Sequence, residues 1–205
     1  CSSDLIIAPY RNNPVDNIRK NHLDEFYSHM NDFFGDHKFK IFVIEQNDDG
    51  KKFNRGKLLN VGIKIAIEKK YDILITHDVD LLPKHNMLNY YLTKYDFPVH
   101  IAWQWKTKYS FNEYFGGIVS FTPKIAKQIN GYPNNFWGWG GEDEELLKRV
   151  KKFYNILKVD SLSEDQIIQT ENIINEILTK SKTVQPEQIQ ELILPIQNQE
   201  NKKEK

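Results

Sequence analysis

The sequence has little of what marks several large classes of protein. It contains one cysteine, Cys1, so no disulfide can form within the chain, and the count does not indicate a redox compartment. No stretch approaches the roughly 20 apolar residues that a membrane-spanning helix needs, and no charged and then apolar leader opens the chain. We therefore expect this fragment to make no membrane contact.

An excess of charge of either sign is also missing. Lys and Arg together number 28, and Asp and Glu together also number 28. Such a chain has no overall field that would draw it to nucleic acid or to an anionic membrane. We expect no nucleic-acid partner, so binding must be sought in local clusters of side chains.

The start of the chain does not indicate where in the cell the protein is located. It begins at Cys1 rather than at a methionine, so a leader, an anchor or another domain could have been removed. A mature bacterial lipoprotein also begins with cysteine, but an arbitrary boundary is the explanation we favour. The 205 residues, of which 40% are hydrophobic, are enough to bury the core of one domain.

Short apolar runs alternate with helical spacing in the first part of the chain. The runs at Asp4–Ala8, Phe39–Ile44 and Tyr71–Thr76 predict buried strands, and the stretches 15–33 and 58–70 predict helices between them. This alternation predicts an α/β fold, with a parallel sheet and helices packed on its faces. Ligands bind such sheets beyond the carboxyl ends of the strands.

The composition changes in the second part of the chain. Aromatic residues and glycines dominate residues 103–141, which favours loops around a site over helices, and a helix is predicted at 142–154. Gln, Glu, Asn, Lys and Ile then take over. We therefore divide the chain into a catalytic domain at 1–158 and a polar, helical and partly disordered tail at 159–205.

Two carboxylates, Asp78 and Asp80, follow the third predicted strand. In an extended segment they would share one side of the chain, and their oxygen atoms suit Mg²⁺ or Mn²⁺ bridging to a diphosphate. A solvated strand end explains a lone Asp-x-Asp pattern more often. His77 points the other way in an extended chain, so a packed or solvent-facing histidine is the better interpretation than a metal ligand.

Two arginines flank the same predicted edge of the sheet. Arg11 follows the first strand, and Arg55 stands just before the second helix. Basic side chains and the amides of a helix start form a natural phosphate site. For either arginine alone an ordinary surface charge is the simpler interpretation, but the pair beside a predicted metal site favours phosphate binding.

The segment Trp137–Glu145 consists of two tryptophans, three glycines and four acidic residues. Indoles can cover the apolar face of a sugar, glycines let the backbone move, and a helix dipole stabilises carboxylates at its start. A mobile loop beside an acidic helix start could close over a substrate. The composition fits equally well a core role for the tryptophans and a capping role for the acids.

Five motifs follow one another along the chain. They are Pro9–Asn13, Phe53–Gly62, His77–Pro83, Tyr114–Gly117 and Asn130–Asp143. Together they resemble the beta-1,4-galactosyltransferase family, glycosyltransferase family 7, and ordered motifs are far more specific than any one of them. The resemblance implies a GT-A fold, with a mostly parallel sheet flanked by helices. It also implies inverting, Mn²⁺-assisted transfer of galactose from UDP-galactose to an acceptor glycan.

The resemblance further implies roles for individual residues. Asp143 would be the general base that takes the proton of the acceptor hydroxyl, and Asp80 would bind the metal. The donor would be bound by Pro9, Tyr10, Arg11, Phe53, Arg55, Asp78, Val79, Tyr114, Gly117 and Trp139. The acceptor would be bound by Trp139, Gly140, Gly141, Glu142 and Asp143.

The chain departs from the family pattern at two places. The family takes further metal ligands from a His-containing segment beyond the Glu-Asp motif, but no histidine follows His100 here. Three interpretations stay open: residues such as Asp160, Glu164 or Asp165 complete the shell, the metal binds with extra waters, or activity has been lost. Asn13 replaces the family's second arginine, which implies weaker donor binding.

Alternatives to galactose transfer also stay open. Tyr114 matches the position where the family's galactose users carry tyrosine and its N-acetylgalactosamine users a smaller aliphatic residue, which favours galactose. A transferase for another UDP-sugar is the nearest alternative, and a catalytically silent sugar- or nucleotide-binding module is the next. A self-associating tail is a third, against which its irregular apolar spacing argues. Animal members of the family lie in the Golgi lumen, which we carry over as an expectation.

Overall fold

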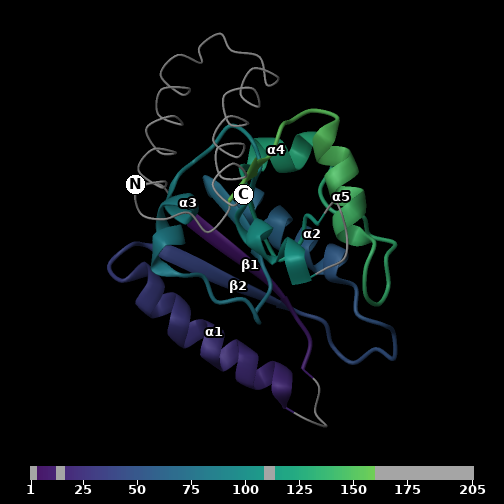
Figure 1. Ribbon diagram of the computed structural model, residues 1–205. Helices are drawn as coiled ribbons and strands as arrows, with labels where there is room; N and C mark the ends of the chain where they lie inside the picture. Colours follow the sequence, from purple (N-terminus) through teal and green to yellow (C-terminus); the bar gives the residue numbers. More distant parts are fainter. Residues whose placement is uncertain (1–3, 13–16, 109–113, 160–205) are drawn as a thin grey trace, which may run out of the picture. The chain divides into compact units, whose positions relative to one another are not determined.

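A computed structural model describes residues 4–12, 17–108 and 114–159, which excludes nearly all of the predicted tail. These residues form a sheet of order β2-β1-β3-β5-β4-β6 with helices on both faces (Figure 1). The strands are β1 (Asp4–Tyr10), β2 (Phe39–Glu45), β3 (Ile73–His77), β4 (Val99–His100), β5 (Ile118–Phe121) and β6 (Leu157–Lys158). The helices are α1 (Ile18–Phe34), α2 (Arg55–Glu68), α3 (Leu88–Leu92), α4 (Pro123–Gln128) and α5 (Glu142–Lys151), with 3-10 helices at His85–Met87 and Ile101–Lys108.

The sheet is parallel where the sequence predicts it and mixed beyond that. β1 pairs in parallel with β2 and β3, whereas β5 runs antiparallel to both of its neighbours, β3 and β4. The prediction of a mostly parallel sheet flanked by helices is confirmed. Because β5 runs the opposite way, the residues that precede it lie at the carboxyl edge of β3, where Ile118 pairs with His77.

α1 and α3 cover one face of the sheet. The ring of Phe26 in α1 lies 4.9 Å from the imidazole of His77, and Phe33 lies 5.0 Å from Tyr91 in α3. His77 Nε2 and the Tyr91 hydroxyl share a hydrogen bond of 2.8 Å. Burial lowers the pKa of His77 to about 4, so His77 is a neutral, packed histidine rather than a solvent-facing one.

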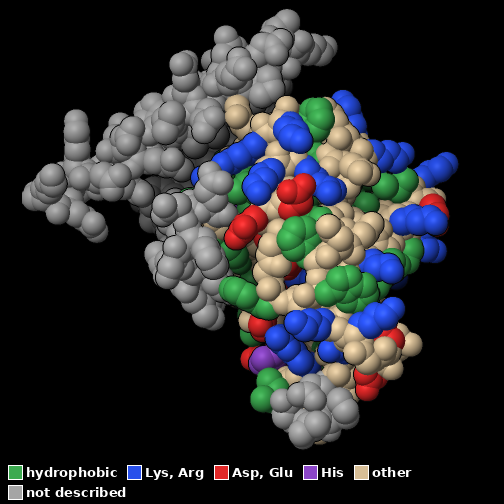
Figure 2. Space-filling model, turned by 90° about the vertical axis from the view of Figure 1, so that its right-hand side faces the viewer, with side chains coloured by type: hydrophobic (Ala, Val, Ile, Leu, Met, Phe, Trp, Pro, Cys, Tyr) green, Lys and Arg blue, Asp and Glu red, His purple; other side chains and the backbone are tan. Residues whose placement is uncertain are grey.

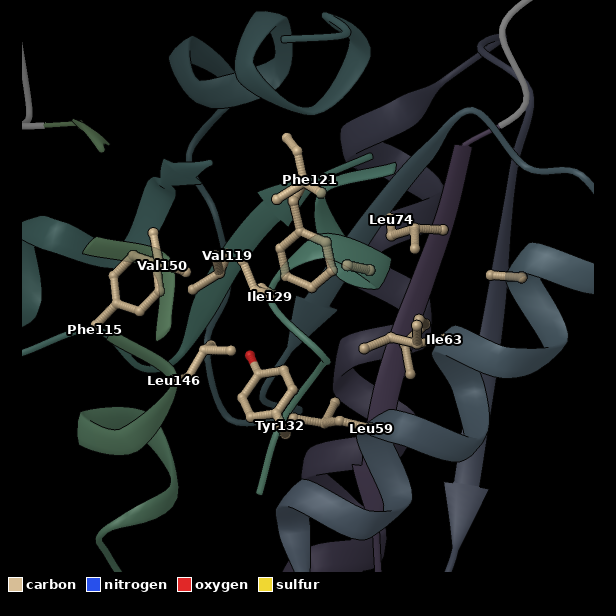
Figure 3. Close-up of a cluster of buried hydrophobic side chains, with 14 of the residues drawn as sticks. Leu59, Ile63, Leu74, Phe115, Val119, Phe121, Ile129, Tyr132, Leu146 and Val150 are labelled. Carbon is tan, nitrogen blue, oxygen red and sulfur yellow. The ribbon is translucent and has the colours of Figure 1, made fainter. Parts of the chain in front are cut away.

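α2, α4 and α5 pack on the opposite face and enclose the main apolar cluster (Figure 3). Gly62 of α2 lies so close to β1 that a Cβ atom there would collide with the side chain of Ile7. The helix can therefore approach the sheet only because this position is glycine. The cluster includes Leu5, Ile7, Leu59, Ile63, Leu74, Val119, Phe121, Ile125, Ile129, Tyr132, Leu146 and Val150.

One prediction of the elements from the sequence is wrong. Residues 103–141 are not loops throughout, because they contain β5 and α4. The hydroxyl of Thr122 caps α4 by accepting a hydrogen bond from the Ile125 amide over 3.3 Å, and Pro123 starts the helix, so a usable start signal was present. In the described ranges, no helix has the length and apolar character to cross a membrane.

Candidate active site

Three of the five motifs meet beyond the carboxyl end of β3. Asp78 directly follows β3, and its amide donates to the carbonyl oxygen of Gly117 over 3.0 Å. Asp143, in the first turn of α5, approaches Gly116 so closely that a Cβ atom there would collide with its Oδ2 atom. Gly116 therefore leaves the space that the Asp143 carboxylate occupies, a role that the sequence did not reveal.

Arg55, the first residue of α2, joins these carboxylates. Its Nε atom donates to Asp78 Oδ1 over 2.8 Å, and its Nη1 atom donates to Asp143 Oδ1 over 2.7 Å. Nη1 also lies 3.8 Å from Glu142 Oε1. The Arg55 side chain is only 11% exposed, which shields these charge-assisted bonds from water. One cation thus faces three carboxylates.

Burial raises the pKa of two of these carboxyl groups, Asp143 and Asp78. Burial raises the pKa of Asp143 to about 7; Arg55 opposes the rise, and Glu142 and Asp78 add to it. Burial also raises the pKa of Asp78. Burial acts to lower the pKa of Arg55, but Asp143 and Asp78 outweigh it and hold that pKa well above its usual value. Asp143 therefore changes protonation near neutral pH, the range in which a general base with this pKa is most effective.

Glu142 offers an unsatisfied acceptor next to Asp143. Its side chain is 9% exposed, and its Oε2 atom is buried without a hydrogen-bond partner in the described part of the chain. A buried carboxylate oxygen without a donor is costly, so a ligand hydroxyl placed there would relieve that cost. The helix dipole also stabilises this acid at the start of α5, and the two roles are compatible.

Tyr132 supports the cluster from the core. Its hydroxyl group shares a hydrogen bond of 2.9 Å with Thr76 Oγ1 of β3, and its ring centre lies 5.9 Å from the guanidinium carbon of Arg55. Figure 3 shows the ring between Leu59 and Leu146. No role was predicted for Tyr132, although it lies within the fifth motif. A lone tyrosine between glycine and proline carries no signal of such packing.

Tyr114 lies on the other side of the glycines. Its ring centre is 5.1 Å from that of His100 in β4, and His100 Nε2 donates to the Gly116 carbonyl oxygen over 2.9 Å. Burial lowers the pKa of His100 to about 4, so this histidine is neutral. A Cβ atom at Gly117 would collide with the Tyr114 hydroxyl group. Tyr114 is thus held at the same edge as Asp143.

Asp78 and Asp80 pair with helices on opposite faces of the sheet. Asp78 pairs with Arg55 of α2, whereas Asp80 Oδ2 lies 3.4 Å from Arg19 Nη1 of α1. The prediction that both carboxylates share one side assumed an extended chain. That assumption is wrong, because residues 79 and 80 form a turn in which the Leu81 amide donates to the Asp78 carbonyl oxygen over 3.2 Å.

The residues present fit a divalent cation only in part. Within residues 4–12, 17–108 and 114–159, no group of three or more His, Cys, Asp or Glu side chains could hold a metal ion. A Mg²⁺-type site, however, needs only one or two carboxylates in addition to water and substrate phosphates. Asp80 is 45% exposed, and its exposed pair with Arg19 is of a weak kind, so it suits such a site. The candidate ligands Asp160, Glu164 and Asp165, like Asn13, lie outside the described residues.

Arg11 lies beyond the end of β1 and has a different type of partner from Arg55. Its Nη1 atom donates to the backbone carbonyl oxygen of Lys51 over 2.7 Å. The two predicted phosphate-binding arginines are therefore held separately, one by a backbone carbonyl and the other by carboxylates. Three other predicted donor residues are buried: Pro9, Tyr10 and Val79.

The residues Trp137–Gly141, which precede α5 and form what we call the tryptophan segment, include two side chains that face solvent. Trp139 is 83% exposed and Trp137 is 43% exposed, so the alternative that both are core residues is wrong. The Gly138 amide donates to the carbonyl oxygen of Phe53 over 2.8 Å, which ties this segment to the loop before α2. Gly140 and Gly141 have φ values of 91° and 92°, conformations that favour glycine. In Figure 2, Lys and Arg side chains surround a few acidic ones on one face of the molecule, so charges of both signs share that face.

Two family descriptions match the sequence. The "N-terminal region of glycosyl transferase group 7" matches residues 2–94, and the "N-terminal domain of galactosyltransferase" matches residues 98–168. Human beta-1,4-galactosyltransferase 3 is 39% identical over 156 residues, which cover 73% of this chain and 38% of that protein. Human beta-1,4-galactosyltransferase 4 is 39% identical over 154 residues, which cover 71% and 42%. The chain thus spans about two fifths of the length of these relatives.

Solved structures resemble the described fold. The catalytic domain of Drosophila beta1,4-galactosyltransferase 7 in complex with xylobiose has a TM-score of 0.69 at 33% identity, covering 80% of this chain and 67% of that chain. A mutant of the Drosophila protein, solved with manganese, UDP-Gal and xylobiose, has a TM-score of 0.68 at 32% identity, with the same coverage of 80% and 67%. These similarities confirm the GT-A fold that the sequence predicts.

Proposed function

The chain belongs to glycosyltransferase family 7, and from that premise we propose that it transfers galactose from UDP-galactose to a hydroxyl group of an acceptor glycan. The matched human relatives are beta-1,4-galactosyltransferases, and a similar Drosophila protein binds UDP-Gal and xylobiose. The observation that carries the proposal is Asp143, a carboxyl group with a pKa of about 7 in the first turn of α5.

Asp143 is proposed as the general base. As the acceptor oxygen bonds to the anomeric carbon, the bond from that carbon to UDP breaks, and its electron pair stays on UDP. Asp143 takes the proton that the acceptor hydroxyl loses, which requires the ionised carboxylate. Arg55, at 2.7 Å, stabilises that form. Attack from the side opposite UDP inverts the anomeric centre.

The donor would lie across the carboxyl edge of β1 and β3. Arg11 and Arg55 would bind the diphosphate, and Asp78 would contact the donor. Tyr114 and Gly117 would lie against the galactose ring. Four further residues are proposed to surround the nucleotide or its phosphates: Pro9, Tyr10, Phe53 and Val79.

The acceptor would lie over the start of α5. Glu142 Oε2 is buried and unpaired among the described residues, which supports its accepting a hydrogen bond from an acceptor hydroxyl group. The exposed indole of Trp139 could cover the apolar face of a sugar when its segment closes, and Gly140 and Gly141 would let the backbone approach.

Mn²⁺ is the metal that we assign, with Asp80 as its ligand from the described residues. The similar Drosophila structure contains manganese. When bound, the ion would supply Lewis-acid stabilisation of the negative charge on departing UDP. For the location of the protein, the Golgi lumen stays a prediction.

The test measures UDP release from a panel of UDP-sugars with Mn²⁺ and several monosaccharide acceptors. Asp143→Asn should lower the rate of transfer from UDP-galactose by about 10²- to 10⁴-fold, the usual contribution of a general base. Glu144→Gln is the matched control, because it removes an exposed acid from the same helix turn and should leave the rate near that of the wild type. Wild-type transfer that Asp143→Asn leaves unchanged would contradict the assignment.

A silent sugar- or nucleotide-binding module is the second candidate. It is supported by the lack of a three-residue metal cluster in the described residues and of any histidine after His100. The same assay separates the two functions when donor binding is measured alongside. A wild type that binds UDP-galactose but releases UDP no faster than Asp143→Asn would be a binding module.

A further inference from the structure

The tripeptide Asn130–Tyr132 lies between the two helices that carry the charged cluster. α2 begins with Arg55, and α5 begins with Glu142 and Asp143. The tripeptide also comes just before the segment that leads through Trp139 to α5. A residue of α2 or α5 that holds this tripeptide in place would fix the position of Asp143 relative to Arg55 without touching the substrate.

Asn60 grips the tripeptide from α2. Its Oδ1 atom accepts a hydrogen bond from the Tyr132 amide over 2.9 Å, and its Nδ2 atom donates to the Tyr132 carbonyl oxygen over 2.7 Å. Nδ2 also donates to Asn134 Oδ1 over 2.9 Å. The side-chain amide thus pairs with both backbone groups of one residue, as a neighbouring strand would.

Arg149 grips the same tripeptide from α5. Its Nη1 atom donates to the carbonyl oxygens of Asn130 and Gly131 over 2.9 Å and 3.0 Å. Its Nε atom donates to Glu145 Oε1 over 3.3 Å, one turn earlier in the helix, which holds the guanidinium in place. Two helices therefore hold three consecutive residues through side chain to backbone bonds.

The backbone of the segment is shaped for this contact. Asn130 and Gly131 have φ values of 57° and 56°, which turn the chain sharply onto α2. A Cβ atom at Gly131 would collide with Asn60 Oδ1, and one at Gly56 would collide with the Pro133 carbonyl oxygen. Residues 131–133 therefore lie in direct contact with α2, so a change in the Asn60 side chain should shift their backbone.

We propose that Asn60 and Arg149 are positioning residues for sugar transfer. By holding Asn130–Tyr132 between α2 and α5, they fix the Asp143 carboxylate against Arg55. They also fix the position at which the chain enters the tryptophan segment. This inference rests on the proposed function. Neither residue was assigned a role by the motifs, although Asn60 and the tripeptide both lie within them.

The first test uses Asn60→Asp, which keeps the acceptor atom and the shape but loses both Nδ2 donor bonds. We expect kcat for UDP release from UDP-galactose to fall by about 10- to 100-fold, because small misplacements of catalytic groups cost that much. The dissociation constant of UDP should stay within about threefold, because the phosphate-binding side chains are unchanged. Lys64→Ala, an exposed change on the same helix, is the control and should match the wild type.

Hydrogen exchange gives a readout that does not depend on activity. In Asn60→Asp, amides of residues 131–141 should exchange faster, whereas those of β1 and β3 should not change. A general loss of stability would speed exchange in all of these segments together. Unchanged exchange in 131–141, or unchanged kcat in an active protein, would overturn the inference. A wild type that transfers no sugar would instead overturn the proposed function, and the exchange would still show whether Asn60 holds the segment.

Arg149 provides a second variant from the other helix. Arg149→Gln should reproduce the loss of kcat and the faster exchange of residues 131–141, while Lys148→Gln, the same charge change at an exposed neighbouring position, should not. Arg149→Lys should recover only part of the rate, since an ammonium group lacks the fork that reaches Glu145 and the carbonyl oxygens together. Full activity in Arg149→Gln would contradict a positioning role for Arg149, just as full activity in Asn60→Asp would contradict one for Asn60.

Discussion

At the scale of single residues, the chemistry of Asp143 depends on its charged neighbours. Burial favours its protonated form most strongly, Arg55 opposes this by favouring the ionised form, Glu142 and Asp78 add to the effect of burial, and the balance puts its pKa at about 7. A carboxylate in water would be a weaker base by about three pKa units. The surroundings of Asp143 therefore give it a pKa that suits the proton transfer proposed for it at neutral pH.

The pH dependence of transfer should follow this balance. A general base acts when ionised, so under the role proposed for Asp143 kcat/KM should rise about tenfold per pH unit below pH 7 and level off above it. Glu142→Gln removes a negative neighbour that raises the pKa of Asp143, so the rising limb should move to lower pH. A pH profile of both proteins measures this. A limb that stays in place or moves to higher pH would contradict the assigned electrostatics.

The free energy of unfolding should also depend on the ionisation of Asp143, but it should fall as the pH rises. The pKa of Asp143 in the folded protein is above its value of about 4 in an unfolded chain, so the folded state keeps the proton to higher pH. This contribution is complete below about pH 4 and is lost as the pH rises to about 7. Relative to Asp143→Asn, the wild type should lose about 4 kcal/mol between pH 4 and pH 8, since each of the roughly three pKa units contributes about 1.4 kcal/mol. Urea unfolding at both pH values measures the difference, and a parallel pH dependence of the two proteins would exclude it.

The proposed preference for galactose as the donor sugar depends on one residue, Tyr114. Tyr114 stands beside Gly117, and replacing it with leucine removes the hydroxyl group that fills the space there. Tyr114→Leu should therefore widen donor use toward UDP-N-acetylgalactosamine, raising its kcat/KM relative to that of UDP-galactose by about tenfold or more. Competition between the two donors measures the ratio. An unchanged ratio would count against galactose specificity set at this position.

At the scale of elements, the antiparallel β5 creates the site. Because β5 starts at the edge where β3 ends, Gly116 and Gly117 come to lie against Asp78 and Asp143. A parallel β5 would carry these glycines to the far edge of the sheet. The start of α2 then completes the cluster by placing Arg55 between the carboxylates.

Two glycine substitutions separate the site from the scaffold. Gly116→Ala should displace the Asp143 carboxylate and lower kcat by about 100-fold, since groups in near contact tolerate little misplacement. Gly62→Ala should instead push α2 away from Ile7, costing about 1–3 kcal/mol of stability with little change in kcat per folded molecule. Thermal unfolding and kinetics on both variants test this. Equal effects on both quantities in the two variants would show that the site and the core are not separable.

The sequence predicted the elements whose patterns are local and long. β1 to β3 follow from short apolar runs, and α1, α2 and α5 follow from apolar residues at helical spacing. β4 and β6 have two residues each, too few to carry a pattern, and the direction of β5 depends on its partners. The motifs indicated most of the charged cluster, but the bond between Arg55 and Asp143 spans 88 positions, and no local pattern reports such a pairing.

At the scale of the whole molecule, the fold and the family are established, and the chemistry is the claim to be tested. The chain spans about two fifths of the length of its curated relatives, and its described part holds a carboxylate paired with a guanidinium and an exposed tryptophan segment. Its formal charge is zero, so an acceptor must be recognised by local contacts rather than by a general field.

The most direct test of galactose transfer is NMR of the product formed from α-linked UDP-galactose labelled with ¹³C at the anomeric carbon. With Mn²⁺ and an acceptor that supports UDP release, the wild type should form a β-linked galactoside, Glu144→Gln should form it at a similar rate, and Asp143→Asn should form it about 10²- to 10⁴-fold more slowly. An α-linked product, or a β-linked product formed as fast by Asp143→Asn as by the wild type, would contradict inverting transfer with Asp143 as the base.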